Sequence, residues 1–289
     1  YNIFIDNMSI NLKIKKGENL MKLKKIGTQI QQIRNATIKL SYGGYIFLID
    51  PWLAPKGATG SLLELNKGEF KVKELVKESI RMPICDLPFS TTEILEDVDF
   101  YIVTHLHPDH FDMDNYNEVL DRNIPIFIQN NAEADFMKNL GFKDIKILQE
   151  NGSSLGKIKL TRVEALHGSL TPCGPASGLI FEAEREPTIY FAGDTIMYDG
   201  VKSVIEKFKP DIIILNVADA FFIKYGHLIM DEEAIDIIHK LAPNAKIIAS
   251  HLDNVAHAYL TRNILLYKLI QKGIEQEILI PNDGQIYDF

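Results

Sequence analysis

The sequence predicts a single α/β domain that carries metal-binding side chains at the ends of its strands. Apolar, β-prone segments alternate with amphipathic segments of helical spacing along most of the chain. Several of these strands end on His or Asp, and the run from Thr104 to His110 holds three of the eight His. With 289 residues, the chain is long enough for one large domain or two small ones. Because no repeat, low-complexity segment or linker divides it, we expect one domain.

The first expected elements are paired strands. Between Gln29 and Asp50 apolar residues alternate with polar ones, and Gly43-Gly44 supplies a hairpin turn. Residues 54–95 lack a comparable strand pattern and contain several prolines, with one charged helical piece near 70–80. Because such a long loop in a compact domain is usually functional, we expect 54–95 to be a lid over the active site. An unimportant surface insertion is the alternative.

Strands and helices alternate through the remainder of the chain. The apolar runs predict strands at 99–103, 124–129, 145–148, 157–165, 178–183, 188–192, 211–217 and 246–250. The helical patterns cover 114–121, 132–140, 201–208, 231–241 and 256–271. Asp231 is a suitable N-cap, and Gly141 and Gly273 follow two of these helices as expected of C-terminal glycines.

Residues 1–20 form a candidate non-native or dispensable extension, which leaves 21–289 as the single domain. Met21-Lys22-Leu23 resembles an ordinary bacterial start, and Lys15-Lys16-Gly17-Glu18 can be encoded by a sequence that resembles a ribosome-binding site. The alternative is that this segment is a genuine additional strand of the domain.

Composition excludes several classes of protein. The net charge of −8 and the pI near 5.5 disfavour a broad nucleic-acid surface, which needs basic residues. No run approaches the roughly 18 apolar residues of a membrane span, and no signal-peptide pattern is present at the N-terminus. Two cysteines are too few for a disulfide framework. We therefore expect a cytoplasmic protein that acts on a small molecule, with a homo-oligomer left open.

The run from His105 to His110 is the strongest chemical signal. His105 and His107 are two apart after an expected strand, so their side chains can share a face. Pro108 bends the chain out of the sheet, and Asp109 and His110 follow on the turn. Imidazoles and a carboxylate that converge without cysteine suit Zn²⁺ or a neighbouring divalent metal. Three further strands end on a metal-type residue, namely His167, Asp194 and His251.

Together these pieces resemble the metallo-β-lactamase superfamily. Within it, the sequence is most similar to the branch of L-ascorbate-6-phosphate lactonase and its uncharacterised hydrolase relatives. The matching pieces span about residues 28–265. They are 33–37 (Ile-Arg-Asn-Ala-Thr), 48–51 (Leu-Ile-Asp-Pro), 104–112, His167-Gly168, 192–195 (Ala-Gly-Asp-Thr), and 251–257 running into Thr261-Arg262.

The resemblance implies an αβ/βα sandwich of two mixed sheets with outer helices and two divalent metals. By this analogy His105, His107 and His167 bind the first metal, and Asp109, His110 and His251 bind the second. Asp194 bridges the metals, and Asp50 supports the ligands from beneath by hydrogen bonds. Zn²⁺ is the first choice because imidazoles dominate the donor set, and Mn²⁺ or Fe²⁺ is left open.

The implied activity is hydrolysis by metal-bound hydroxide, with a lactone or ester of a small metabolite, phosphorylated or not, as the first choice of substrate. A phosphodiesterase of the same fold is the alternative, and a metal-binding sensor without turnover is a third. His107 stands where related di-iron oxygen reductases carry Glu, which favours a hydrolase. Asp109 and Asp194 are the expected catalytic carboxylates. His227 is a further catalytic candidate, although a loop His facing solvent is the simpler interpretation.

Overall fold

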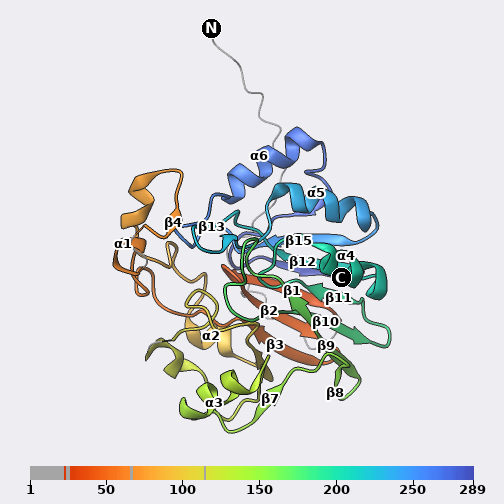
Figure 1. Cartoon of the computed structure of the whole chain (residues 1–289). Helices are drawn as coiled ribbons and strands as arrows, with labels where there is room; N and C mark the ends of the chain where they lie inside the picture. Colours follow the sequence, from red (N-terminus) through yellow and green to blue (C-terminus); the bar gives the residue numbers. More distant parts are fainter. Residues whose placement is uncertain (1–22, 24–26, 66–67, 114) are drawn as a thin grey trace, which may run out of the picture.

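A computed structural model describes residues 23, 27–65, 68–113 and 115–289, so the prediction for residues 1–20 lies outside the described residues. Two seven-stranded sheets pack face to face, and helices cover the outer surface of each sheet (Figure 1). This arrangement confirms the predicted αβ/βα sandwich.

The first sheet has the strand order β17-β1-β2-β3-β5-β6-β7. Its strands are β1 (Gln29–Arg34), β2 (Thr37–Tyr42), β3 (Tyr45–Ile49), β5 (Phe100–Ile102), β6 (Ile126–Ile128), β7 (Ile145–Ile147) and β17 (Ile286–Asp288). Strands β1, β2 and β3 pair antiparallel through tight turns, whereas β3, β5, β6 and β7 run parallel. The carboxyl ends of β3 and β5 therefore meet at one edge of the sheet.

The second sheet has the strand order β16-β15-β12-β11-β10-β9-β8. Its strands are β8 (Ser153–Leu155), β9 (Ile158–Ala165), β10 (Ala176–Ala183), β11 (Ile189–Phe191), β12 (Ile212–Asn216), β15 (Lys246–Ser250) and β16 (Ile278–Leu279). Strands β8 to β11 pair antiparallel, and β11, β12, β15 and β16 run parallel. Each sheet thus joins an antiparallel part to a parallel part.

Apolar side chains fill the space between the sheets and the space beneath the helices. The inner core includes Phe47 and Phe100 from the first sheet and Phe181 and Ile214 from the second. The helices are α1 (Leu62–Leu65), α2 (Thr91–Leu95), α3 (Asn131–Asn139), α4 (Asp199–Phe208), α5 (Glu232–Leu241) and α6 (Arg262–Lys272), with 3₁₀ turns at Leu75–Ser79 and Asn115–Val119. Among the described residues, every helix is too short or too polar to cross a bilayer.

A third, small sheet ties the 54–95 segment to the second half of the chain. Strand β4 (Phe70–Lys71) pairs with β13 (Phe221–Phe222), which pairs with β14 (Gly226–His227). The base of the segment is held by buried Arg34, whose guanidinium donates to the carbonyls of Trp52, Ala54 and Cys85. The segment is therefore anchored at both its base and its tip.

The structure corrects several predicted elements. Phe70–Lys71 is a strand and not part of a helix, because its backbone pairs with β13. The last long helix begins at Arg262, not at Ala256, because the Thr261 side chain caps its N-terminus by accepting from the Ile264 amide. The predicted helix at 114–121 contains only a 3₁₀ turn over Asn115–Val119.

Candidate metal centre

The candidate ligands lie at the ends of strands from both sheets. Asp50 follows β3, and the run His105 to His110 follows β5 in the first sheet. His167, Asp194 and His251 follow β9, β11 and β15 in the second sheet. Because the two sheets pack face to face, their strand ends bring these side chains to one edge of the sandwich, as the sequence predicted.

Three imidazoles form the first donor group. His105 Nε2 lies 3.0 Å from His107 Nδ1, and His167 Nε2 lies 3.2 Å from the same atom. Asp109, His110 and His251 form the second group, in which His251 Nε2 lies 3.2 Å from both Asp109 Oδ2 and His110 Nε2. Each trio can present its donor atoms within 4.8 Å of one another.

Asp194 lies between the two groups. Its Oδ2 is 3.2 Å from His110 Nε2 and 3.9 Å from His251 Nε2 on one side. On the other side it is 4.0 Å from His105 Nε2 and 3.9 Å from His167 Nε2. A carboxylate oxygen this close to donors of both groups has the position expected of a ligand shared by two ions.

Asp50 supports the first sheet's donors from beneath. Fully buried, it accepts hydrogen bonds from the Thr104 amide at 2.7 Å and the Thr104 hydroxyl at 2.8 Å. Its Oδ2 also lies 2.8 Å from His110 Nδ1, so His110 Nε2 is the nitrogen left for the centre. This carboxylate fixes the imidazole orientation in the way that supporting carboxylates do at metal sites.

Backbone and amide groups orient the other donors. His167 Nδ1 lies 2.8 Å from the Leu228 carbonyl oxygen, which accepts its proton and leaves Nε2 free. Asn216 Nδ2 donates to Asp194 Oδ1 at 2.8 Å, which leaves Asp194 Oδ2 facing the imidazoles. The side chain of buried Asn35 donates to the Asp109 carbonyl at 3.1 Å and lies 3.2 Å from His251 Nε2.

Two glycines allow the chain to turn sharply beside these donors. A Cβ at Gly168, where φ is +133°, would lie 2.2 Å from the Thr171 carbonyl oxygen. A Cβ at Gly193, where φ is +65°, would lie 2.5 Å from the Ser177 carbonyl oxygen. Since no side chain fits at such distances, glycine is required directly after His167 and directly before Asp194.

Burial and mutual charge set the protonation of the cluster. Burial lowers the pKa of His105 and His167, and it lowers the pKa of His107 to about 4. Burial alone would also lower the pKa of His110, but Asp194 and Asp50 outweigh it and raise that pKa well above its usual value. The pKa of Asp194 falls well below its usual value because His110 and His251 outweigh its burial.

These residues fit a pair of divalent cations. Five imidazoles and two carboxylates turn their donor atoms inward, and neighbouring imidazole nitrogens approach to 3.0–3.2 Å. Two facing nitrogens can share only one proton, so bringing several such pairs together in a buried site is costly without a cation. Nitrogen and oxygen donors without thiolate suit Zn²⁺, Mn²⁺ or Fe²⁺.

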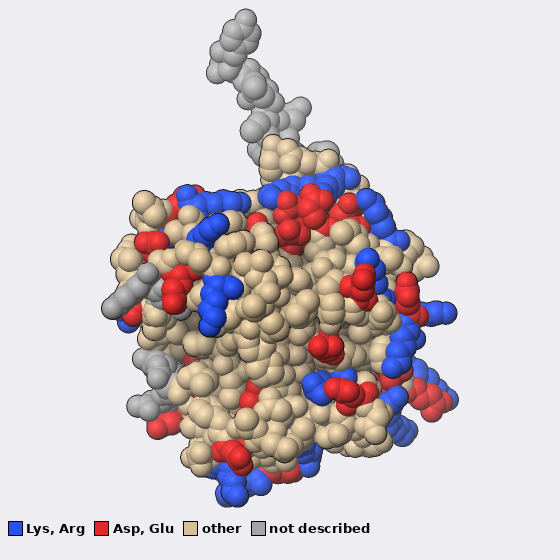
Figure 2. Space-filling model, viewed as in Figure 1, with Lys and Arg blue, Asp and Glu red and all other residues tan. Residues whose placement is uncertain are grey.

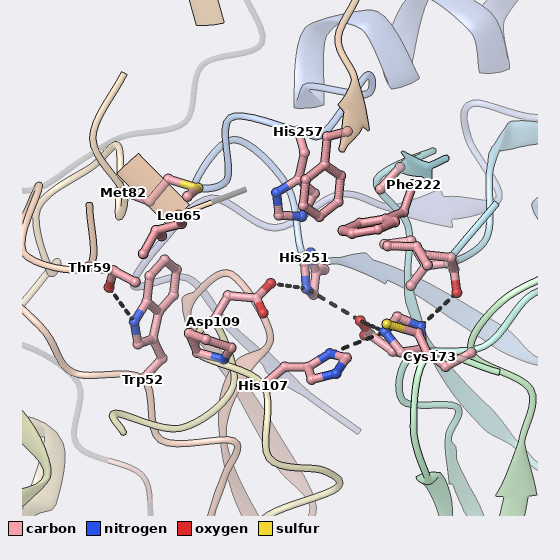
Figure 3. A pocket seen from close by; sticks show the side chains of 17 residues that line it. Trp52, Thr59, Leu65, Met82, His107, Asp109, Cys173, Phe222, His251 and His257 are labelled. Atoms are coloured by element: carbon pink, nitrogen blue, oxygen red, sulfur yellow. Dashed lines mark hydrogen bonds and ion pairs between the residues drawn. The ribbon is translucent and has the colours of Figure 1, made fainter. Parts of the chain in front are cut away.

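A cavity of about 340 Å³ opens beside the donors (Figure 3). Its polar wall contains His107, Asp109, His167, Asp194 and His251. The remaining lining is mostly apolar or aromatic: Trp52, Thr59, Leu65, Phe70, Met82, Pro108, Cys173, Ala220, Phe222, Leu228, Ile229 and His257. Thr59, Leu65, Phe70 and Met82 come from the 54–95 segment, which thus covers one side of the cavity.

The structure does not bring His227 together with the donors. Its side chain is 53% exposed, and its Nδ1 lies 3.4 Å from Asp219 Oδ1. His227 is not among the residues that line the cavity. Cys173 does line the cavity, and burial raises the pKa of its thiol to about 11. Sequence reasoning did not assign Asn35 or Asn216 to the site, because no local spacing connects them to the residues that they orient.

Comparison with known proteins agrees with this geometry. Residues 46–251 match the beta-lactamase superfamily domain. The UPF0173 protein YddR of Bacillus subtilis (strain 168) is 40% identical over 264 residues, which cover 90% of this chain and 99% of that protein. More distant relatives, such as MJ1163 of Methanocaldococcus jannaschii, at 26% identity over 75% of this chain and 94% of that protein, carry the name UPF0173 metal-dependent hydrolase.

Two solved structures are similar over nearly the whole chain. A possible metal-dependent hydrolase from Veillonella parvula is 33% identical with a TM-score of 0.83, covering 91% of this chain and 100% of that one. An isothiocyanate hydrolase from Delia radicum gut bacteria is also 33% identical with a TM-score of 0.82, covering 90% and 99% of the two chains.

Proposed function

The chain belongs to the metallo-β-lactamase superfamily, and within it to the UPF0173 family of metal-dependent hydrolases, and we propose that it hydrolyses a small, uncharged substrate. In this substrate an apolar group is attached to the electrophilic carbon that water attacks. The observation that carries the proposal is the division of the cavity into a wall of metal donors and an apolar, aromatic remainder. The family supports hydrolysis with metals, and the lining supports the class of substrate.

The chain's own residues divide the work. His105, His107 and His167 would hold one ion, Asp109, His110 and His251 would hold the other, and Asp194 would lie between the two donor groups. When bound, two divalent cations lower the pKa of water and stabilise negative charge that develops on the substrate. Asp109 lines the cavity, so we assign its carboxylate to accept the proton of the attacking water.

The cavity lining favours an uncharged substrate over a phosphorylated one. Among the described residues, no Lys or Arg lines the cavity, although phosphate recognition ordinarily uses such groups. On the face shown in Figure 2, Lys and Arg are interspersed with Asp and Glu and form no continuous basic patch. A phosphodiester or nucleic-acid substrate is therefore less suited to this site than an uncharged molecule.

Isothiocyanates and lactones or esters are the two substrate types within this class. An isothiocyanate is small, uncharged and electrophilic at its central carbon, and one relative at 33% identity is named as an isothiocyanate hydrolase. A lactone or ester of similar size is electrophilic at its carbonyl carbon, and the resemblance of the sequence to a lactonase branch supports this type of substrate. Both can carry an apolar group that would pack against Phe70, Phe222 and Trp52, which line the cavity.

A substrate panel on the Zn²⁺-loaded protein tests the proposal. The panel contains benzyl isothiocyanate, γ-nonalactone, phenyl acetate and bis(4-nitrophenyl) phosphate, each measured before and after chelation. We expect metal-dependent turnover of the isothiocyanate, which releases benzylamine and carbonyl sulfide, or of the lactone or ester. Fastest turnover of the phosphodiester would contradict the substrate class, and no metal-dependent turnover of any compound would favour a sensor.

A further inference from the structure

His257 is a polar residue of the cavity lining that lies outside the two donor groups of the metal centre. It lines the cavity from the loop between His251 and α6. Its ring stacks on Phe70, with 4.3 Å between ring centroids and an interplanar angle of 18°. Phe222 packs against the edge of the same Phe70 ring at 4.7 Å. Three segments that are far apart in sequence therefore build one aromatic wall.

The loop that carries His257 is held firmly. Tyr259 donates its amide to the Ala218 carbonyl at 2.8 Å, and Lys77 Nζ donates to the Ala258 carbonyl at 3.1 Å. The stack on Phe70 then fixes the plane of the imidazole. A side chain fixed in this way can present a hydrogen-bonding atom to a ligand without a further loss of conformational entropy on binding.

The hydrogen bonding of the ring is incomplete. Nδ1 is buried and has no hydrogen-bond partner within the described part of the chain. A buried N–H without an acceptor is rarer in proteins than a lone pair without a donor, so the neutral ring is better protonated on Nε2. Burial lowers the pKa of His257 to about 4, with Asp109 opposing the shift and His251 adding to it, so the ring is neutral at neutral pH.

The nitrogen-bearing side of the ring is turned toward Asp109 and His251 (Figure 3). His257 is partly exposed although Nδ1 is buried, which leaves Nε2 as the nitrogen that reaches the cavity. Resting on the proposed function, we propose that His257 is a substrate-contacting residue whose Nε2–H donates to the sulfur or oxygen atom of the substrate while Phe70 and Phe222 hold its apolar group. The site thereby selects molecules that combine an acceptor atom with an aromatic or aliphatic group.

The matched test compares two ligands and two substitutions. The ligands are 4-phenylbutan-2-one, which has an aromatic ring and an acceptor but cannot be hydrolysed, and butylbenzene, which lacks the acceptor. His257→Phe keeps the stacked ring and removes the donor, and His257→Gln restores a donor near the position of Nε2. His239→Phe, on α5 away from the cavity, is the control. Each variant is loaded with Zn²⁺, and its metal content and Tm are measured first.

We expect His257→Phe to weaken binding of the ketone about tenfold, the effect of one lost hydrogen bond, and to change butylbenzene binding by less than about twofold. Metal content and Tm should match those of the unmodified protein. His257→Gln should recover part of the ketone affinity. Equal effects on both ligands, or a ketone that binds the unmodified protein no better than butylbenzene, would overturn the proposal.

Kinetics separate this inference from the proposed function. On whichever panel substrate is hydrolysed, His257→Phe should lower kcat/KM about tenfold, with partial rescue by His257→Gln. If the unmodified protein hydrolyses none of the panel, the proposed function fails and the ligand pair still decides the role of His257. If turnover is normal in His257→Phe and ketone binding is unchanged, this inference fails and the proposed function stands.

Discussion

Asp194 and Cys173 line the same cavity, but Asp194 is placed to act as a metal ligand and Cys173 is not suited to act as a nucleophile. Asp194 Oδ2 lies within 4.0 Å of four imidazole nitrogens, whereas burial raises the pKa of the Cys173 thiol to about 11. A thiol that stays protonated at neutral pH is a poor nucleophile. The hydroxyl of Ser169 already takes part in a hydrogen bond within the protein, since it accepts from the His227 amide at 2.9 Å.

We therefore predict that water attacks the substrate directly, without a covalent enzyme intermediate. Asp194→Ala should abolish turnover because the two donor groups lose their shared ligand, while Cys173→Ala and Ser169→Ala should each keep most of kcat. A single turnover in ¹⁸O-labelled water should label the product and leave the protein unlabelled. Trapping an acyl or thiocarbamoyl group on Cys173 or Ser169 would refute this mechanism.

The raised pKa of His110 makes metal binding depend on pH. Asp194 and Asp50 hold the imidazole of His110 in its charged form in the metal-free protein, and a metal must displace that proton. The lowered pKa of His105 and of His107 means that these ligands offer no such competition near neutrality. Zn²⁺ affinity should therefore fall as the pH falls from about 8 to about 6. A chelator-competition titration that finds constant affinity over this range would contradict the prediction.

At the residue scale, sequence analysis identified the candidate donors and Asp50, which orients His110, but not the two asparagines that orient Asp194 and Asp109. The run from His105 to His110 can be recognised in the sequence because its donors are close together along the chain. His167, Asp194 and His251 can be recognised because each follows a predicted strand. Asn216 and Asn35 reach Asp194 and Asp109 only through the packing of the sheets. No periodicity in one sequence encodes such distant contacts. The place of His257 in the cavity wall likewise depends on Phe70, which is distant in sequence.

At the element scale, the buried strands of the sandwich were predicted well and the short elements were not. Strands such as β12 and β15 are continuous apolar runs, which the pattern identifies without further context. Strands β4, β13 and β14 have two residues each, too few for any periodicity. They form because the 54–95 segment and residues 221–227 meet in space, so their pairing is a tertiary effect.

Shortening the 54–95 segment tests its role as a cover for the cavity. Gly60 and Met82 already pair, since Met82 donates its amide to Gly60 at 2.8 Å, so residues 61–81 can be replaced by an Asn-Gly turn. We expect KM for apolar substrates to rise about tenfold, because Leu65 and Phe70 are lost from the lining, while metal content stays unchanged.

Leu75→Ala, at a side chain on the same segment that is 78% exposed, is the matched control and should leave KM unchanged. If the shortened protein keeps its substrate range and KM, the segment is a surface insertion and not a cover.

At the scale of the whole molecule, the site exists only because the two sheets pack together. The first sheet supplies Asp50 and the run from His105 to His110, and the second supplies His167, Asp194 and His251. The interlocked aromatic core between the sheets holds these two sets in register, with Phe47 packed against both Phe100 and Phe181. Metal binding is thus a property of the assembled sandwich.

Residues 1–20 should contribute little to this assembly. Leu23 is 7% exposed and belongs to the core beneath the first sheet, so the removal must stop before it. We predict that a chain beginning at Met21 keeps its Tm and metal content. A fall in Tm of many degrees would show instead that the first 20 residues pack as part of the domain.

The number of metal ions per chain tests the central claim most directly. Two trios of donors that share Asp194 predict close to two divalent ions per chain by elemental analysis of the purified protein, or after reconstitution with Zn²⁺ or Mn²⁺. Asp194→Ala, analysed in parallel, should hold fewer ions. At most one ion per chain in the unmodified protein, after reconstitution with both metals, would contradict the two-metal site on which the proposed hydrolysis depends.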